Sequence, residues 1–132
     1  MSANLDLVRS IYADWERGDF RSADWAHPKI VFESTGFDSM KSTGVAEMGH
    51  RWREWMSTWN DYRTEAEEFR ELDAEHVLVL MHHGGRGKAS GVGVEDLRAP
   101  GANVFEIHDG KVTRLALYWD RNRALADLGL EA

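Results

Sequence analysis

Two neighbouring histidines of this 132-residue sequence are of a residue type that is suited to acid–base chemistry. His82 and His83 end an apolar run that predicts a strand, so their side chains point to opposite faces. At most one imidazole can then face a pocket and act there as a general acid or base. We take His83 as that candidate. The alternative is that both histidines meet solvent at a hairpin end beside Gly84-Gly85.

Other polar patterns fail the spacing that their chemistry requires. His50 and Glu54 lie one helical turn apart, but no third ligand accompanies them, as a metal site would need. The segment Gly84–Ala89 lacks both the leading glycine and the closing hydroxyl residue of a phosphate-binding loop. The sequence therefore predicts no metal and no cofactor.

Large aromatic side chains are frequent, with six tryptophans, five phenylalanines and three tyrosines. Trp52, Trp55 and Trp59 recur at helical spacing within one apolar stripe. Such a stripe is either ordinary core or, where several rings surround a cavity, the wall of a site for a flat apolar ligand. Both interpretations stay open at this point.

The hydrophobic periodicity places helices first and strands afterwards, which indicates an α+β fold. The expected helical segments are Asn4–Arg17 with Asn4 as N-cap, a turn at Arg21–Ala26, the stripe from Val45 to Trp59, and Arg121–Leu128 capped by Asp120. The expected strands are Lys29–Ser34, Tyr62–Leu72, Glu75–His83, Val92–Ile107 with an interruption near Pro100-Gly101, and Val112–Trp119. A polar loop is expected at Thr35–Thr43 and a hairpin turn at Asp109-Gly110.

Length and charge limit the class of protein. The 132 residues suit a single domain, residues 1–132, and the lack of cysteine excludes disulfides and thiolate nucleophiles. With 16 basic and 23 acidic residues the net charge is −7, which argues against nucleic acid or an anionic membrane as partner. Without an apolar run of roughly 18 residues or a signal-peptide pattern, we expect a cytoplasmic protein.

Four segments together resemble a known superfamily. They are Tyr12–Asp19 (Tyr-x-x-Trp-x-x-Gly-Asp), the strand Ile30–Ser34 followed by the tryptophan-rich helix, the stretch Asn103–Lys111, and the ending Tyr118–Leu130. The chain resembles the superfamily of nuclear transport factor 2, the ketosteroid isomerases and the SnoaL-type polyketide cyclases, and is most similar to small SnoaL-like proteins.

This resemblance implies a cone: a curved antiparallel sheet wrapped around helices, with an apolar pocket inside. It also implies a homodimer formed through the outer face of the sheet. Strand alternation would then turn Asn103, Phe105 and Trp119 into the cone. Tyr12 and Trp15 would approach the pocket from a helix.

The catalytic residues of a ketosteroid isomerase are mostly replaced by other residue types at the matching positions of this sequence. That enzyme needs a strand carboxylate as base and two hydrogen-bond donors, a tyrosine and a protonated aspartate. The base position holds Ser34 here, the acidic donor position holds Asn103, and the tyrosine position holds Ile11 with Tyr12 beside it. Ser34 is no base without an activating partner, whereas the Asn103 amide can still donate.

Two further members of the superfamily suggest acid–base groups. SnoaL-type cyclases use a carboxylate or histidine over a bound polyketide, for which His83 and Asp96 are the candidates. Asp96 and Arg98 share one strand face, similar to the water-activating groups of limonene-epoxide hydrolases. The residue order differs, however, and a surface ion pair explains these two residues equally well.

The resulting prediction is a protein that binds a small hydrophobic ligand, polyketide-, steroid- or terpenoid-like, without the isomerase carboxylate. The alternative is an acid–base enzyme, of cyclase, isomerase or epoxide-hydrolase type, acting on such a ligand. The predicted catalytic or orienting groups are His83, Asn103, Tyr12 and Asp96. The predicted ligand-binding residues are Trp15, Phe32, Ser34, Trp55, Trp59, Phe105 and Trp119.

Overall fold

A computed structural model describes residues 3–17, 24–35, 40–57, 63–85 and 97–130. The three helices are α1 (Ala3–Glu16), α2 (Val45–Ser57) and α3 (Arg121–Asp127). The strands are β1 (Ala26–Thr35), β2 (Met40–Thr43), β3 (Arg63–Glu71), β4 (His76–Gly85), β5 (Leu97–His108) and β6 (Lys111–Tyr118). The predicted α+β class is confirmed, and the strand expected at Tyr62–Leu72 is present as β3. No helix of the described residues is long and apolar enough to cross a membrane.

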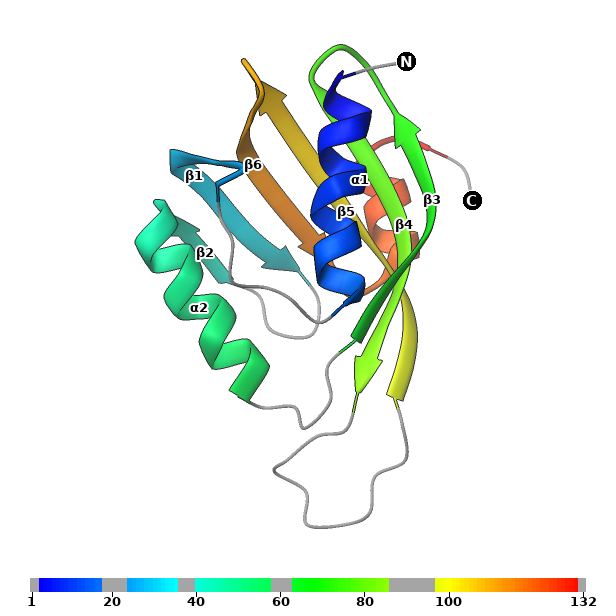
Figure 1. Cartoon of the computed structure of the whole chain (residues 1–132). Coiled ribbons are helices and arrows are strands. Elements are labelled where there is room, and N and C mark those ends of the chain that lie inside the picture. Colours follow the sequence, from blue (N-terminus) through cyan, green and yellow to red (C-terminus); the bar gives the residue numbers. More distant parts are fainter. Residues whose placement is uncertain (1–2, 18–23, 36–39, 58–62, 86–96, 131–132) are drawn as a thin grey trace.

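The strands form one sheet in the order β2-β1-β6-β5-β4-β3 (Figure 1). All neighbours run antiparallel except β1 and β6, which are parallel, so the sheet is mixed rather than wholly antiparallel. Helix α1 packs on β3 and β4, and α2 packs on β1 and β2. These two helices cover the inner face of the sheet, whereas α3 packs on β5 and β6 from the outer face.

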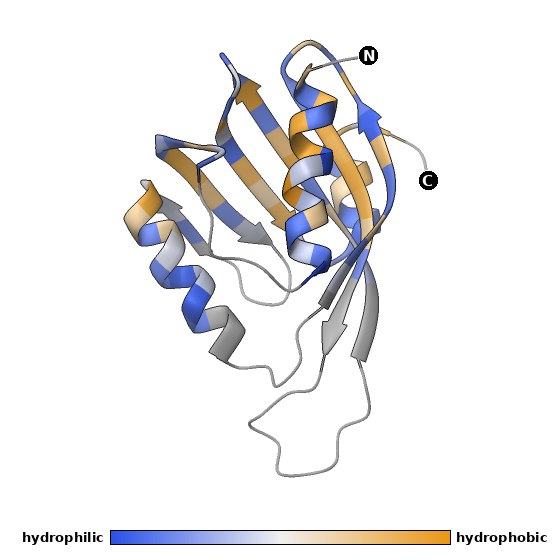
Figure 2. Cartoon of the chain, viewed as in Figure 1, coloured by the Kyte–Doolittle hydropathy of each residue, from blue (hydrophilic) through white to orange (hydrophobic). Residues whose placement is uncertain are grey.

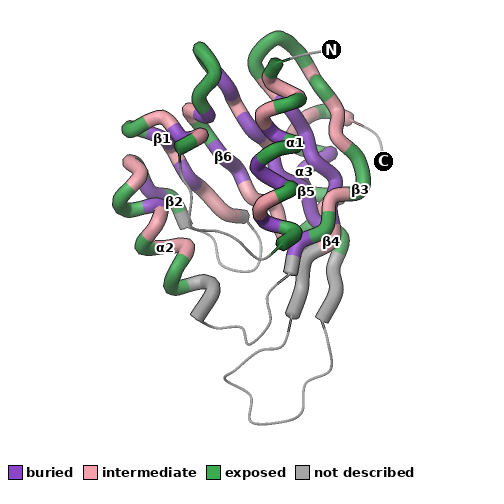
Figure 3. The backbone as a smooth tube through the Cα atoms, in the orientation of Figure 1, coloured by how far each residue is buried: buried purple, intermediate pink, exposed green. Residues whose placement is uncertain are grey.

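The central strand β4 is apolar on both faces. Val77, Val79 and Met81 belong to the inner core cluster under α1, as the predicted alternation requires. Leu78 and Leu80 point the other way and pack with Ala124 and Leu125 of α3. The apolar stretches of β4 to β6 in Figure 2 coincide with the buried stretches in Figure 3. The sheet therefore carries a core on each side.

Two predictions near the start of the chain are wrong: the N-cap of the first helix and the end of the helical turn before β1. Asn4 is not an N-cap: α1 already includes Ala3, and the Asn4 amide donates to the carbonyl of Ala74, 2.9 Å away. The expected helical turn at Arg21–Ala26 is wrong at its end, because Ala26 opens β1 and pairs with Val112. Residues 18–23 lie outside the described part.

Two expected interruptions are also wrong. Met40–Thr43 is not loop but β2, which pairs antiparallel with β1. Pro100-Gly101 does not break β5, which runs on through both residues. The β5–β6 ladder starts only at Ala102, so the missing N–H of Pro100 removes no hydrogen bond from it.

Local turn chemistry agrees with the sequence. Asp109 (φ 51°) and Gly110 (φ 76°) both occupy the left-handed region, as a tight hairpin between β5 and β6 requires. Asp120 caps α3 by accepting a hydrogen bond from the backbone N–H of Asn122 at 3.0 Å. Gly129 (φ 70°) closes α3.

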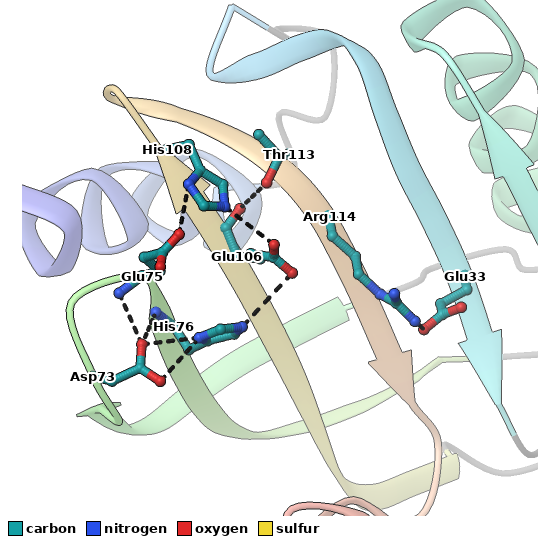
Figure 4. A network of polar contacts seen from close by, with 8 residues as sticks. All are labelled: Glu33, Asp73, Glu75, His76, Glu106, His108, Thr113 and Arg114. Carbon is teal, nitrogen blue, oxygen red and sulfur yellow. Dashed lines mark hydrogen bonds and ion pairs between the residues drawn. The ribbon is translucent and has the colours of Figure 1, made fainter.

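A row of charged side chains crosses the outer face where β4 begins (Figure 4). Nε2 of His108 and Nε2 of His76 lie 3.1 Å and 3.6 Å from the two carboxylate oxygens of Glu106. Nδ1 of His76 contacts Asp73, and Nδ1 of His108 contacts Glu75 at 2.6 Å. The row thus joins the β3–β4 turn to β5. It is exposed, and solvent screening keeps such pairs weak.

The proton on His108 should be linked to stability. The hydrogen bond to Glu106, assisted by the charges of Glu75, Glu106 and Asp109, raises the pKa of His108 above 6.5. A raised folded-state pKa stabilises the fold fully below pH 6.5, and this contribution disappears as pH rises through the folded pKa.

We therefore expect His108→Gln to lower the free energy of unfolding more at pH 6 than at pH 9. Urea titrations across this range, with and without 1 M NaCl, measure the difference, which salt should reduce. An equal loss for His108→Gln at every pH would contradict the linkage.

Candidate functional site

A buried polar contact on the inner face joins two side chains that are far apart in sequence. Asn103, in the middle of β5, is 2% exposed, and Tyr12, on the sheet-facing side of α1, is 1% exposed. Nδ2 of Asn103 donates a hydrogen bond to the Tyr12 hydroxyl. Oδ1 of Asn103 is buried and has no hydrogen-bond partner among the described residues. An unpaired buried acceptor of this kind costs about 1–3 kcal/mol.

The strand register aligns the neighbours of Asn103 across the sheet. Asn103 lies between Leu117 of β6 and Val79 of β4, and Ser34 of β1 lies beyond Leu117. Ser34 and Leu117 are only half-buried although β1 and β6 belong to the covered sheet. At this level of the sheet the inner face is therefore less completely covered at Ser34 and Leu117 than at Val79, which is fully buried.

Aromatic rings surround the polar pair. The Tyr12 ring lies 5.0 Å from that of Trp15, 5.8 Å from that of Phe69 and 6.2 Å from that of Phe105, between centroids. Trp15 continues the cluster to Trp52 at 5.1 Å, and Trp52 contacts Phe32 at 5.4 Å. Tilted and edge-to-face contacts at these distances are favourable beyond simple area burial. The interior around Asn103 is thus strongly apolar.

Comparisons with known proteins bear on the fold. The sequence matches no family model and no curated protein. An NTF2-like protein of unknown function from Burkholderia pseudomallei superposes with a TM-score of 0.78 at 17% identity, over 96% of this chain and 97% of its own. The chain has the NTF2-like fold.

Two further solved structures with this fold contain small molecules. TerC, co-crystallised with polyporic acid, matches with a TM-score of 0.74 and 18% identity, over 96% of this chain and 98% of its own. A ketosteroid isomerase-like protein from Catenulispora acidiphila, in complex with trimethylamine, matches with a TM-score of 0.74 and 14% identity, over 96% of this chain and 94% of its own. At such identities the likeness concerns the NTF2-like fold alone.

Within this fold the structure brings six of the predicted site residues to the inner side. They are Tyr12, Trp15, Phe32, Ser34, Asn103 and Phe105. Trp119 follows β6 directly and is half-buried. Asp96 and Trp59 lie outside the described residues, as do the side chains of His83 and Trp55, although the His83 backbone pairs with Thr64 and Ala99.

Several members of the inner face were not singled out as site residues from sequence. Trp52 and Phe69 complete the aromatic cluster, and both occupy the inward positions of their elements. The hydroxyls of Ser42 and Thr64 are buried without a partner among the described residues. Periodicity could have placed Trp52 and Phe69 inward, but an unpaired hydroxyl leaves no trace in a sequence.

Shifted pKa values occur away from this interior. Among the described residues, the hydrogen bond from Arg114 to Glu33 raises the pKa of Arg114, and burial raises the pKa of Tyr118. Both groups belong to the outer side, where Tyr118 packs against the α3 cluster. His82 also pairs outward, with Glu67, which contacts Arg121 of α3. Among the described residues, the buried polar groups of the inner site are neutral: hydroxyls, the Asn103 amide and the indole N–H of Trp52, which suit the orienting of a ligand.

A metal site and a separate cavity are the other kinds of site that the fold could offer. The described residues contain no group of three histidine or acidic side chains that could hold a metal ion. A cavity of about 300 Å³ lies between α1 and the β5–β6 turn, and its lining includes Ile11, Asp14, Trp25 and Lys111. It is separate from the Tyr12–Asn103 pair.

Removing the Tyr12 hydroxyl should destabilise the protein. In Tyr12→Phe the Asn103 amide loses its hydrogen bond to the Tyr12 hydroxyl, so we expect a loss of about 1–3 kcal/mol of unfolding free energy. Tyr118→Phe is the matched control: its hydroxyl donates to Asp127 in an exposed bond of 3.1 Å, and its loss should cost less than about 1 kcal/mol. Urea denaturation of both variants makes the comparison. Equal losses of unfolding free energy in the two variants would mean that the buried hydrogen bond contributes no more to stability than the exposed one.

Proposed function

We propose that this chain binds a small hydrophobic molecule, polyketide-, steroid- or terpenoid-like, in its aromatic interior. The observation that carries the proposal is Oδ1 of Asn103, a buried acceptor without a partner among the described residues. The amide of the same side chain donates to Tyr12, whose ring contacts those of Trp15 and Phe105. Such atoms are rare in folded proteins because each one lowers stability. A bound ligand that pairs with this oxygen accounts for its retention.

The surroundings support an apolar ligand with one polar end. Tyr12, Trp15 and Phe105 offer flat apolar faces, and the Tyr12–Asn103 pair is the polar feature between them. Apolar sites with a few placed polar groups are the usual form of small-molecule pockets. The half-buried Ser34 and Leu117 mark the side from which a ligand would enter.

Binding without turnover is the form we favour. The strand position at which isomerases carry a carboxylate holds Ser34, and the neighbouring Glu33 is engaged with Arg114 on the outer face. The related structures with polyporic acid and with trimethylamine support ligand binding by this fold without specifying the ligand of this chain.

A thermal-shift screen tests ligand binding directly. Steroids, aromatic polyketides, terpenoid epoxides and fatty acids form the panel. A ligand present at a hundredfold excess over its dissociation constant adds about 2.7 kcal/mol, which raises the melting temperature of a domain of this size by several degrees.

For any hit, Asn103→Leu should weaken binding by about 1–3 kcal/mol, while Asn122→Leu, at an exposed position of α3, should not. No shift from any class, or equal binding by both variants, would contradict the proposed site.

A second copy of the chain is the other partner we propose. Helix α3 already covers Leu78, Leu80 and Ala102, so a homodimer would use the rest of the outer face, around β1 and β6. Val31 is half-buried there and the Glu33–Arg114 pair lies beside it, which leaves apolar and complementary charged groups for a two-fold contact. Light scattering at micromolar concentration should give twice the chain mass of 15.1 kDa. A monomer mass would rule the dimer out.

A further inference from the structure

The geometry points to a ligand that donates, rather than accepts, the orienting hydrogen bond: we infer that the site selects phenols, enols or alcohols over the corresponding ethers and ketones. This inference rests on the proposed ligand site and specifies the chemistry of its polar end. It depends on which atom of the Asn103 amide is engaged and which is not.

The two polar atoms of the amide differ in their surroundings. Nδ2 already donates to the Tyr12 hydroxyl, whereas Oδ1 is buried without a partner among the described residues. A ligand hydroxyl would give Oδ1 the donor that it lacks. A ketone or ether oxygen at the same place would leave Oδ1 unpaired and would set two acceptors against each other. A site built around a buried unpaired acceptor therefore discriminates strongly against analogues that lack the donor.

The neighbours of Asn103 strengthen the preference for a ligand that donates a hydrogen bond. Its cross-strand neighbours on the inner face, Val79 and Leu117, are apolar and supply no competing donor. Phe105 and the ring of Tyr12 exclude water from the same region, since both residues are at most 1% exposed. In such surroundings an unpaired acceptor is costly, so the gain on meeting a donor is large.

The approach of the ligand is also constrained. Oδ1 itself is inaccessible to solvent, so a ligand reaches it only by displacing a neighbouring side chain. Leu117 is the cross-strand neighbour that remains half-buried, and Ser34 beside it is half-buried as well. A flat molecule entering over these two residues places its hydroxyl end at Asn103 and its apolar body against the aromatic cluster.

The test uses three probes of matched shape: 2-naphthol, 2-methoxynaphthalene and 2-acetylnaphthalene. They share one flat apolar body and differ in whether their oxygen can donate. Isothermal titration calorimetry on the wild-type chain gives each dissociation constant. We expect 2-naphthol to bind at least about tenfold more tightly than either acceptor-only probe, since one good hydrogen bond to a buried group is worth about that factor.

Two variants distinguish the contribution of this hydrogen bond from the contribution of apolar contacts to the affinity. In Asn103→Leu the preference for 2-naphthol should fall to about twofold or less, whereas Asn122→Leu should keep it. If Asn103→Leu does not fold, the wild-type ratio alone decides.

Equal or tighter binding of the ether or ketone by the wild-type chain would overturn the donor preference but leave the proposed ligand site standing. Failure of all three probes to bind at millimolar concentration would overturn the ligand site and this inference with it.

Discussion

Both faces of β4 are apolar, and each face needs its own cover. The inner residues Val77, Val79 and Met81 require α1, and the outer residues Leu78 and Leu80 require α3. Because α1 must lie across β3 and β4, its buried Tyr12 comes to rest over β5, where Asn103 faces inward. The position of the polar pair thus follows from the demand to bury a doubly apolar strand.

The polar pair lowers the stability of the fold. A leucine at position 103 would match the apolar neighbours Val79 and Leu117 and would remove the unpaired oxygen of Asn103, although it would also take away the N–H that donates to the Tyr12 hydroxyl. The amide instead introduces an acceptor that the fold itself does not satisfy, at a cost of about 1–3 kcal/mol. Residues that lower stability in this way are typical of functional sites, where selection maintains a local departure from good packing.

Local patterns predicted most of the architecture. The alternation of β4, the Asp109-Gly110 turn and the Asp120 cap depend on neighbours in sequence, so they could be inferred from the residues alone. Strand β2, the continuous path of β5 through Pro100 and the bond from Asn4 to Ala74 depend on partners far along the chain. For the site, the inward direction of Asn103 was predictable, but the unpaired state of its oxygen exists only in three dimensions.

The parallel pairing of β1 with β6 has a consequence for the order in which the chain acquires its structure. Glu33 and Arg114, joined across these strands, are 81 residues apart in sequence. Closing so long a loop is costly in entropy, whereas the β5–β6 hairpin needs only its tight turn. During synthesis β1 can pair with β2 early, but its other edge must wait without a partner until β6 has left the ribosome. This early segment is where a chaperone would be expected to bind and where aggregation would be expected to begin.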